Sequence, residues 1–181
     1  GPPYRIFRLR GKSVAGLGQM DPAMRAAGVP ACWNTYIRVD DCAATEGSAR
    51  VLGATVTVPT MAAAGAGLFA FLQDPQGANF AVWQPLAHHG ADLRDEPGAL
   101  AWVECATRDV AAAKAFYGAL FGWTFADMAV GGKAYTIILA GAAAVGGLMA
   151  IAPEWGTVPP HWLPYFGTAG VFHSVDDICG W

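Results

Sequence analysis

One pattern occurs twice in this chain and limits the folds that it can adopt. Residues 102–125 begin as an alternating strand, pass through Asp109 into an apolar helical stripe, stop at Gly122 and become extended again. An aspartate before a helix caps its free amides, and a glycine after it takes the left-handed conformation that ends it. Residues 33–58 show the same order. The sequence therefore predicts two strand–helix–strand segments.

Two further strands are predicted after each of these segments. In the first copy residues 74–77 (Asp-Pro-Gln-Gly) separate them, and this composition suits a tight turn. In the second copy the strands meet at Gly141. The sequence thus predicts two βαβββ units, within residues 33–84 and 99–151.

A longer repeat links the two ends of the chain. Residues 4–17 resemble residues 135–148, and a Trp-x-x-Tyr pattern at 33–36 recurs at 162–165. The two copies lie about 130 residues apart in the chain. A period of this length indicates a duplicated domain rather than a solenoid.

The repeats divide the chain into five predicted segments. They are the end of an incomplete βαβββ half (1–31), a complete half (32–84), a linker (85–98), a second complete half (99–151), and a linker with the start of an unfinished half (152–181).

Composition excludes several classes of partner. The net charge is −3 and only 14% of residues are charged, so the chain lacks the basic surface that nucleic acid requires. Glycines interrupt the apolar stretches, so we expect no membrane span, and no signal peptide is apparent. The four cysteines form no CxxC pair, which favours reduced thiols and a cytoplasmic location.

The helix of the second unit carries a family signature. Residues 109–123 read D-x-x-x-A-x-x-F-Y-x-x-L-F-G-W, and residues 74–84 add a second family-like run. Together they resemble the vicinal oxygen chelate superfamily of glyoxalase I, bleomycin-resistance proteins and extradiol dioxygenases. Within it, the tandem "hydroxylase-like" proteins common in actinobacteria are the nearest type. The resemblance covers about residues 4–166.

This resemblance implies an α+β fold. Paired βαβββ half-units would form curled half-barrel sheets around a cavity, as in the glyoxalase/bleomycin-resistance fold. The two complete halves would pair with each other or with those of a second chain, so we expect a homodimer, either swapped or side by side.

The resemblance also identifies where metal ligands would lie. Metal-using relatives place a His on a first strand and a Glu on a last strand. Those positions hold Asn34 and Trp102 on the first strands, and Ala81 and a residue of 148–150 on the last strands. None is a strong ligand for a divalent ion. We therefore predict no cofactor and no metal site, and keep a divalent metal as the alternative.

Aromatic and polar residues occupy the positions that would face the cavity. The alternation places five candidates for ligand binding there, namely Trp102, Asn34, Tyr36, Trp83 and Tyr135. Such residues suit a flat aromatic or cationic ligand. The alternative is that they are core residues, and this is what we expect for Phe116, Tyr117 and Trp123.

Glu104 is the candidate catalytic residue. A carboxylate on an apolar strand loses hydration if it faces a closed cavity, and can then act as a proton donor or acceptor. The alternatives are an ion pair with Arg38 or Arg108, or exposure at a sheet edge.

Two classes of function follow. The first is a protein that binds a small hydrophobic or aromatic, drug-like molecule without the usual metal. The second is a lyase, isomerase or hydroxylase-like enzyme that uses Glu104, or a metal held by a missing half. A non-catalytic scaffold is a third hypothesis.

Overall fold

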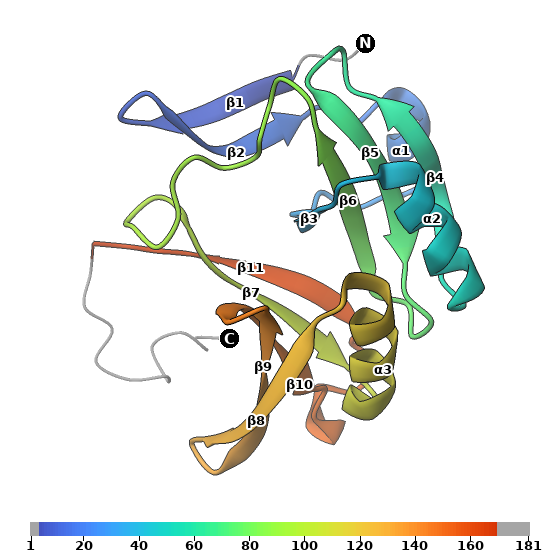
Figure 1. Ribbon diagram of the computed structural model, residues 1–181, viewed down its shortest axis with the longest axis vertical. Coiled ribbons are helices and arrows are strands. Elements are labelled where there is room, and N and C mark those ends of the chain that lie inside the picture. The colour runs from blue at the N-terminus through green and yellow to red at the C-terminus, as the bar shows by residue number, and fades with distance from the viewer. Residues whose placement is uncertain (1–3, 170–181) are drawn as a thin grey trace.

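The computed structural model describes residues 4–169, and Figure 1 shows their arrangement. The strands are β1 (Tyr4–Leu9), β2 (Lys12–Gly18), β3 (Tyr36–Arg38), β4 (Thr55–Ala62), β5 (Gly67–Gln73), β6 (Asn79–Pro85), β7 (Leu100–Thr107), β8 (Thr124–Val130), β9 (Lys133–Ala140), β10 (Ala143–Ala150) and β11 (His161–Phe166). The helices are α1 (Pro22–Ala26), α2 (Cys42–Val51), α3 (Val110–Phe121) and the 3-10 turn η1 (Pro153–Trp155).

The predicted helix ends are confirmed. Asp41 precedes α2 and accepts a hydrogen bond from the amide of Ala44 at 2.9 Å. Asp109 precedes α3 and accepts from the amide of Ala112 at 3.0 Å. Gly122 ends α3 with φ of 69°, a conformation that glycine adopts without a steric penalty.

The first unit comprises β3, α2, β4, β5 and β6. Its sheet has the order β3-β6-β5-β4, with β3 parallel to β6 and the other pairs antiparallel. Helix α2 packs on one face, over alternate residues such as Ala70, Leu72 and Val82. The predicted βαβββ order is therefore present, and the opposite face of this sheet carries no helix.

The second unit comprises β7, α3, β8, β9 and β10, and its sheet also includes β11. The strand order is β11-β7-β10-β9-β8, with β7 parallel to β10 and β11 antiparallel to β7. The start of the predicted unfinished half is thus the strand that flanks β7. The part of that half after residue 169 lies outside the described residues.

Strands β1 and β2 form a separate hairpin, in the region predicted to end an incomplete half. Val14 packs against Leu93 and Ala99 of the segment that joins the two units. The amide of Ser13 also donates to the Asp92 carboxylate at 2.8 Å. The hairpin is therefore attached to the joining segment and belongs to neither large sheet (Figure 1).

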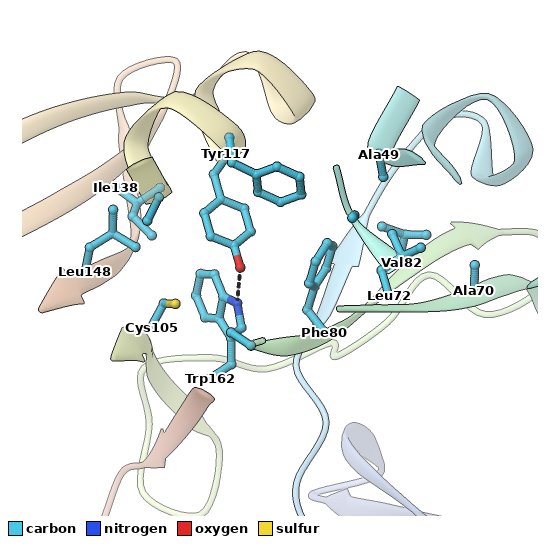
Figure 2. Packing of buried hydrophobic residues seen from close by; sticks show 14 of the residues in the cluster. Ala49, Ala70, Leu72, Phe80, Val82, Cys105, Tyr117, Ile138, Leu148 and Trp162 are labelled. Carbon is cyan, nitrogen blue, oxygen red and sulfur yellow. Dashed lines mark hydrogen bonds between the residues drawn. The ribbon is translucent and has the colours of Figure 1, made fainter. Parts of the chain in front are cut away.

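The two units share one hydrophobic core. Phe80 of β6 packs edge-on against Phe116 and Tyr117 of α3, with ring centroids 6.3 and 5.7 Å apart. Trp162 of β11 joins them from below (Figure 2). The predicted core role of Phe116, Tyr117 and Trp123 is confirmed, with Trp123 partly buried. The units thus meet through aromatic residues of β6, α3 and β11.

Among the described residues, no helix has the length and apolar character needed to cross a membrane.

Candidate functional site

Each sheet has one face without a helix, which we call its open face. In the second unit, Val103, Cys105 and Thr107 point toward α3, and the alternate residues of β7 point to the open face. Those alternate residues include Trp102 and Glu104. The predicted alternation of β7 is therefore confirmed, and it sets the two candidate residues side by side.

Four side chains on this open face form a hydrogen-bonded group. The indole Nε1 of Trp102 donates to the hydroxyl oxygen of Tyr135 on β9 at 2.8 Å. The hydroxyl of Tyr165 on β11 donates to Oε1 of Glu104 at 3.0 Å. All four side chains are partly buried. We call this set, Trp102, Glu104, Tyr135 and Tyr165, the Glu104 cluster.

The electrostatics of the Glu104 cluster keep a proton on Tyr135. Burial raises the pKa of the Tyr135 phenol, and the nearby Glu104 carboxylate raises it further. Because Trp102 already donates to its oxygen, Tyr135 directs its own proton to Glu104 in the hydrogen bond that joins these two side chains. The cluster therefore offers one carboxylate acceptor that two phenols and an indole border.

A glycine allows Tyr135 to lie flat against the sheet. Gly147 on β10 pairs with Glu104 of β7, and a Cβ at Gly147 would collide with the hydroxyl end of Tyr135. The hairpin β1–β2 repeats this contact, because Tyr4 covers Gly16 in the same way. The repeat seen between residues 4–17 and 135–148 thus corresponds to a shared side-chain contact.

The open face of the first unit is aromatic. Tyr36 on β3 contacts Phe71 and Trp83 edge-on, with ring centroids 5.7 and 6.3 Å apart. The indole of Trp83 donates to the carbonyl of His88 at 2.9 Å. Burial, with a smaller contribution from Tyr4, raises the pKa of Tyr36 to about 12. This face therefore offers ring edges and neutral phenols.

The six predicted site residues fall into two groups. Trp102, Glu104 and Tyr135 lie together in the second unit, whereas Tyr36 and Trp83 lie together in the first. Asn34 is exposed just before β3.

The described residues show neither an ion pair of Glu104 with Arg38 or Arg108 nor a position of Glu104 at a sheet edge. Arg108 donates to the carbonyls of Gly156 and Val158 at 2.9 and 2.8 Å, and Arg38 lies on β3 in the other sheet. Strand β7 lies between β11 and β10, so Glu104 is not at a sheet edge.

Tyr165 is the member of the Glu104 cluster that the sequence prediction did not include. Its signal was present, because Tyr165 occupies the place of Tyr36 in the repeated Trp-x-x-Tyr pattern. The pattern could not show that the strand carrying Tyr165 pairs with β7, which is what brings its hydroxyl to Glu104.

Among the described residues, the expected ligand positions do not fit a divalent metal. Across residues 4–169 no group of three His, Cys, Asp or Glu side chains is arranged to hold a metal ion. Ala81 faces Tyr36 at the last-strand position of the first unit, and in the second unit Leu148 packs in the core. Neither can supply a ligand atom.

A hollow of about 400 Å³ lies away from both open faces. It is bounded by the start of α2, including Asp41 and Thr45, and by the end of α3 near Phe121 and Trp123. It contains no member of the Glu104 cluster, so we do not place ligand chemistry there.

Comparison with known proteins adds independent information. Residues 100–136 match the family described as "Bleomycin resistance protein-like N-terminal". "Putative glyoxylase CFP32" of Mycobacterium tuberculosis (strain CDC 1551 / Oshkosh) is 39% identical over 178 residues, which is 98% of this chain and 64% of that protein. "Anthracycline biosynthesis protein DnrV" of Streptomyces peucetius is 33% identical over 173 residues, which is 90% of this chain and 62% of that protein.

A solved structure shows a weaker similarity. A mutant of 4-hydroxymandelate synthase from Streptomyces coelicolor aligns with a TM-score of 0.44 at 17% identity, over 75% of this chain and 45% of that one.

This chain thus spans somewhat less than two thirds of the two curated relatives named above. Those relatives align along nearly its whole length, the family match falls on β7, α3 and the start of the next strands, and both units have βαβββ topology. The family match and the named relatives fit the vicinal oxygen chelate superfamily, as the helix signature predicted.

Proposed function

We propose that this chain binds a flat aromatic small molecule on the open face of the second unit. The observation that carries the proposal is the Glu104 cluster. A carboxylate there accepts a hydrogen bond from Tyr165 and is bordered by the rings of Trp102 and Tyr135. Aromatic walls favour a planar ligand, and the carboxylate favours a hydroxyl or ammonium group on it.

The name of one relative and the description of the matching family support this class of ligand. That relative is described as an anthracycline biosynthesis protein, and the matching family is described by bleomycin resistance. An anthracycline is a planar ring system with hydroxyl and amine groups. The Glu104 carboxylate would accept hydrogen bonds from these groups. We therefore choose doxorubicin, an anthracycline, as the probe.

The test is a fluorescence titration with doxorubicin. Glu104→Gln removes the charge and keeps the shape, so we expect it to weaken binding about 10-fold or more, because hydrogen bonds to charged groups are the strong ones. Glu154→Gln is the matched control, since Glu154 is an exposed acid on η1 outside the cluster.

Two outcomes would contradict the proposal. One is equal binding by the Glu104 and Glu154 variants. The other is binding of 8-anilinonaphthalene-1-sulfonate as tightly as doxorubicin, because that dye adsorbs to apolar surface without needing a carboxylate.

An enzyme is the second candidate function, and one observation favours it. The carboxylate of Glu104 lies next to the hydroxyls of Tyr165 and Tyr135, so a proton could move between ligand and side chains. A lyase, isomerase or hydroxylase-like reaction would use it, or a metal held partly by residues outside this chain. Mass spectrometry of the incubated probe and elemental analysis of the purified chain would detect either.

The homodimer expected from the sequence stays a prediction. Light scattering at high protein concentration would test it, and a single-chain mass would count against it.

A further inference from the structure

A buried hydrogen-bonded chain crosses the boundary between the two units. Tyr117 of α3 is fully buried, and its hydroxyl donates to Oδ2 of Asp74 at 2.8 Å. Its oxygen also accepts from the indole Nε1 of Trp162 at 2.9 Å (Figure 2). Asp74 belongs to the β5–β6 turn of the first unit, and Trp162 belongs to β11 of the second sheet.

The direction of this chain is fixed by chemistry. An ionised carboxylate only accepts hydrogen bonds, and an indole only donates them. Tyr117 must therefore give its single proton to Asp74 and accept from Trp162. Replacing any one of the three polar groups leaves a neighbour buried without its partner, which is costly.

The Asp74 end of the chain is held rigidly. Asp74 is 4% exposed, and its Oδ1 accepts from the amides of Gln76 and Ala78, both at 2.9 Å. Gln76 also exchanges two hydrogen bonds of 2.8 Å with the backbone of Asp109, at the start of α3. The turn at 74–77 therefore contacts α3 at two places, through Gln76 at the capping residue Asp109 and through Asp74 at Tyr117.

The Trp162 end lies on β11, which is an edge strand of the second sheet in the described part of the chain. Among the described strands, β11 has only β7 as a partner in the sheet. Trp162 points to the core, whereas Tyr165, three residues later, points to the open face and donates to Glu104. The anchorage of Trp162 thus influences where Tyr165 lies.

We propose that Asp74 and Tyr117 are positioning residues for ligand binding, and that through Trp162 they hold Tyr165 on Glu104. This inference rests on the proposed function, because it concerns the same open face. It assigns a role to the Asp-Pro-Gln-Gly turn: the first unit sets the geometry of the binding face on the second. Neither Asp74 nor Tyr117 contacts the ligand.

The test is a double-mutant cycle measured by doxorubicin binding. Tyr117→Phe keeps the ring and removes the hydroxyl, and we expect it to weaken binding about fivefold. In protein that already carries Tyr165→Phe, the same change should alter binding less than about twofold, because the two residues act through one contact. Equal losses in both backgrounds, or no loss from Tyr117→Phe, would overturn the inference.

A control separates positioning from loss of stability. Ile138→Val removes one methylene from the same core, beneath α3 and outside the hydrogen-bonded chain. It should lower the free energy of unfolding and leave binding unchanged. If Tyr117→Phe does not fold, Asp74→Asn replaces it. An Asn amide that keeps its oxygen on the turn amides must present NH₂ to Tyr117, so the direction of the chain is broken and the same binding loss is expected.

A ligand-free measurement distinguishes this inference from the proposed function. Amide hydrogen exchange in residues 161–166 should be faster in Tyr117→Phe than in Ile138→Val. Unchanged exchange would overturn the inference. If exchange rises while Glu104→Gln and Tyr165→Phe leave doxorubicin binding intact, the anchorage stands and the proposed function fails.

Discussion

In the first unit Tyr36 of β3 lies opposite Ala81 of β6, and in the second unit Glu104 of β7 lies opposite Gly147 of β10. Both pairs join the first and last strands of a βαβββ unit and face away from its helix. The fold therefore presents one equivalent position twice. A phenol fills it in one unit and a carboxylate in the other, so the chemistry of the open face is set by the side chain and not by the topology.

The strands beside these positions also differ. In the second unit β11 flanks β7 and brings Tyr165 to Glu104. In the first unit β3 has only β6 as a partner among residues 4–169, and Tyr36 is 45% exposed. The comparison shows that a flanking strand converts an exposed first strand into a partly buried site.

The largest expected difference is in the unfolding free energy that is lost when each tryptophan of the repeated Trp-x-x-Tyr pattern is replaced by alanine. Trp162 is 6% exposed and hydrogen-bonded to Tyr117, so Trp162→Ala should cost about 3–5 kcal/mol of unfolding free energy. Trp33 is 51% exposed and contacts Phe166 in a tilted arrangement with ring centroids 4.8 Å apart, so Trp33→Ala should cost about 1 kcal/mol or less. Urea denaturation measures both, and equal losses would mean that the repeat positions are equally supported.

A smaller difference in stability is expected between alanine substitutions at Gly147, which Tyr135 covers, and at Gly16, which Tyr4 covers. Gly147→Ala would push Tyr135 off the sheet and break its hydrogen bond with Trp102, at a cost of about 1–3 kcal/mol. Gly16→Ala should be nearly neutral, because Tyr4 is 64% exposed and can swing into solvent. Thermal unfolding of the two variants tests this, and an equal fall in Tm would show that Tyr4 is as constrained as Tyr135.

The smallest effect concerns alkaline pH. The pKa of Tyr36 is raised to about 12, whereas a tyrosine in the unfolded chain titrates near 10. The unfolded state therefore releases this proton first, and Tyr36 contributes stability that is present below pH 10 and lost toward pH 12. Stability of Tyr36→Phe should fall less steeply between pH 10 and 12. Parallel pH profiles for the two proteins would contradict the assignment.

Local sequence patterns were sufficient for the units themselves. The Asp109 cap, the Gly122 stop and the alternation of β7 each depend on neighbouring residues in the chain, so the strand, helix and side of Glu104 followed directly. The repeat also predicted which segment would open the next half. The repeat also showed that Tyr165 is equivalent to Tyr36, but it did not predict that Tyr165 would bond to Glu104.

Long-range pairing lay beyond the sequence. That Trp102, Glu104 and Tyr135 would meet, and that Tyr36 and Trp83 would form a different group, depends on which strands share a sheet. Strand order is a matter of contacts between residues distant in the chain, and periodicity contains no information on it.

The sequence by itself determined two βαβββ units, their caps, and the placement of Glu104 on a helix-free face, because each follows from local spacing and backbone preference. Only the tertiary structure decided that β11 flanks β7, which brings Tyr165 to Glu104, and that Asp74 of one unit anchors Trp162 of the other. The physical reason is that these hydrogen bonds join residues far apart in the chain. Local spacing, which reports only on neighbouring residues, does not predict such contacts.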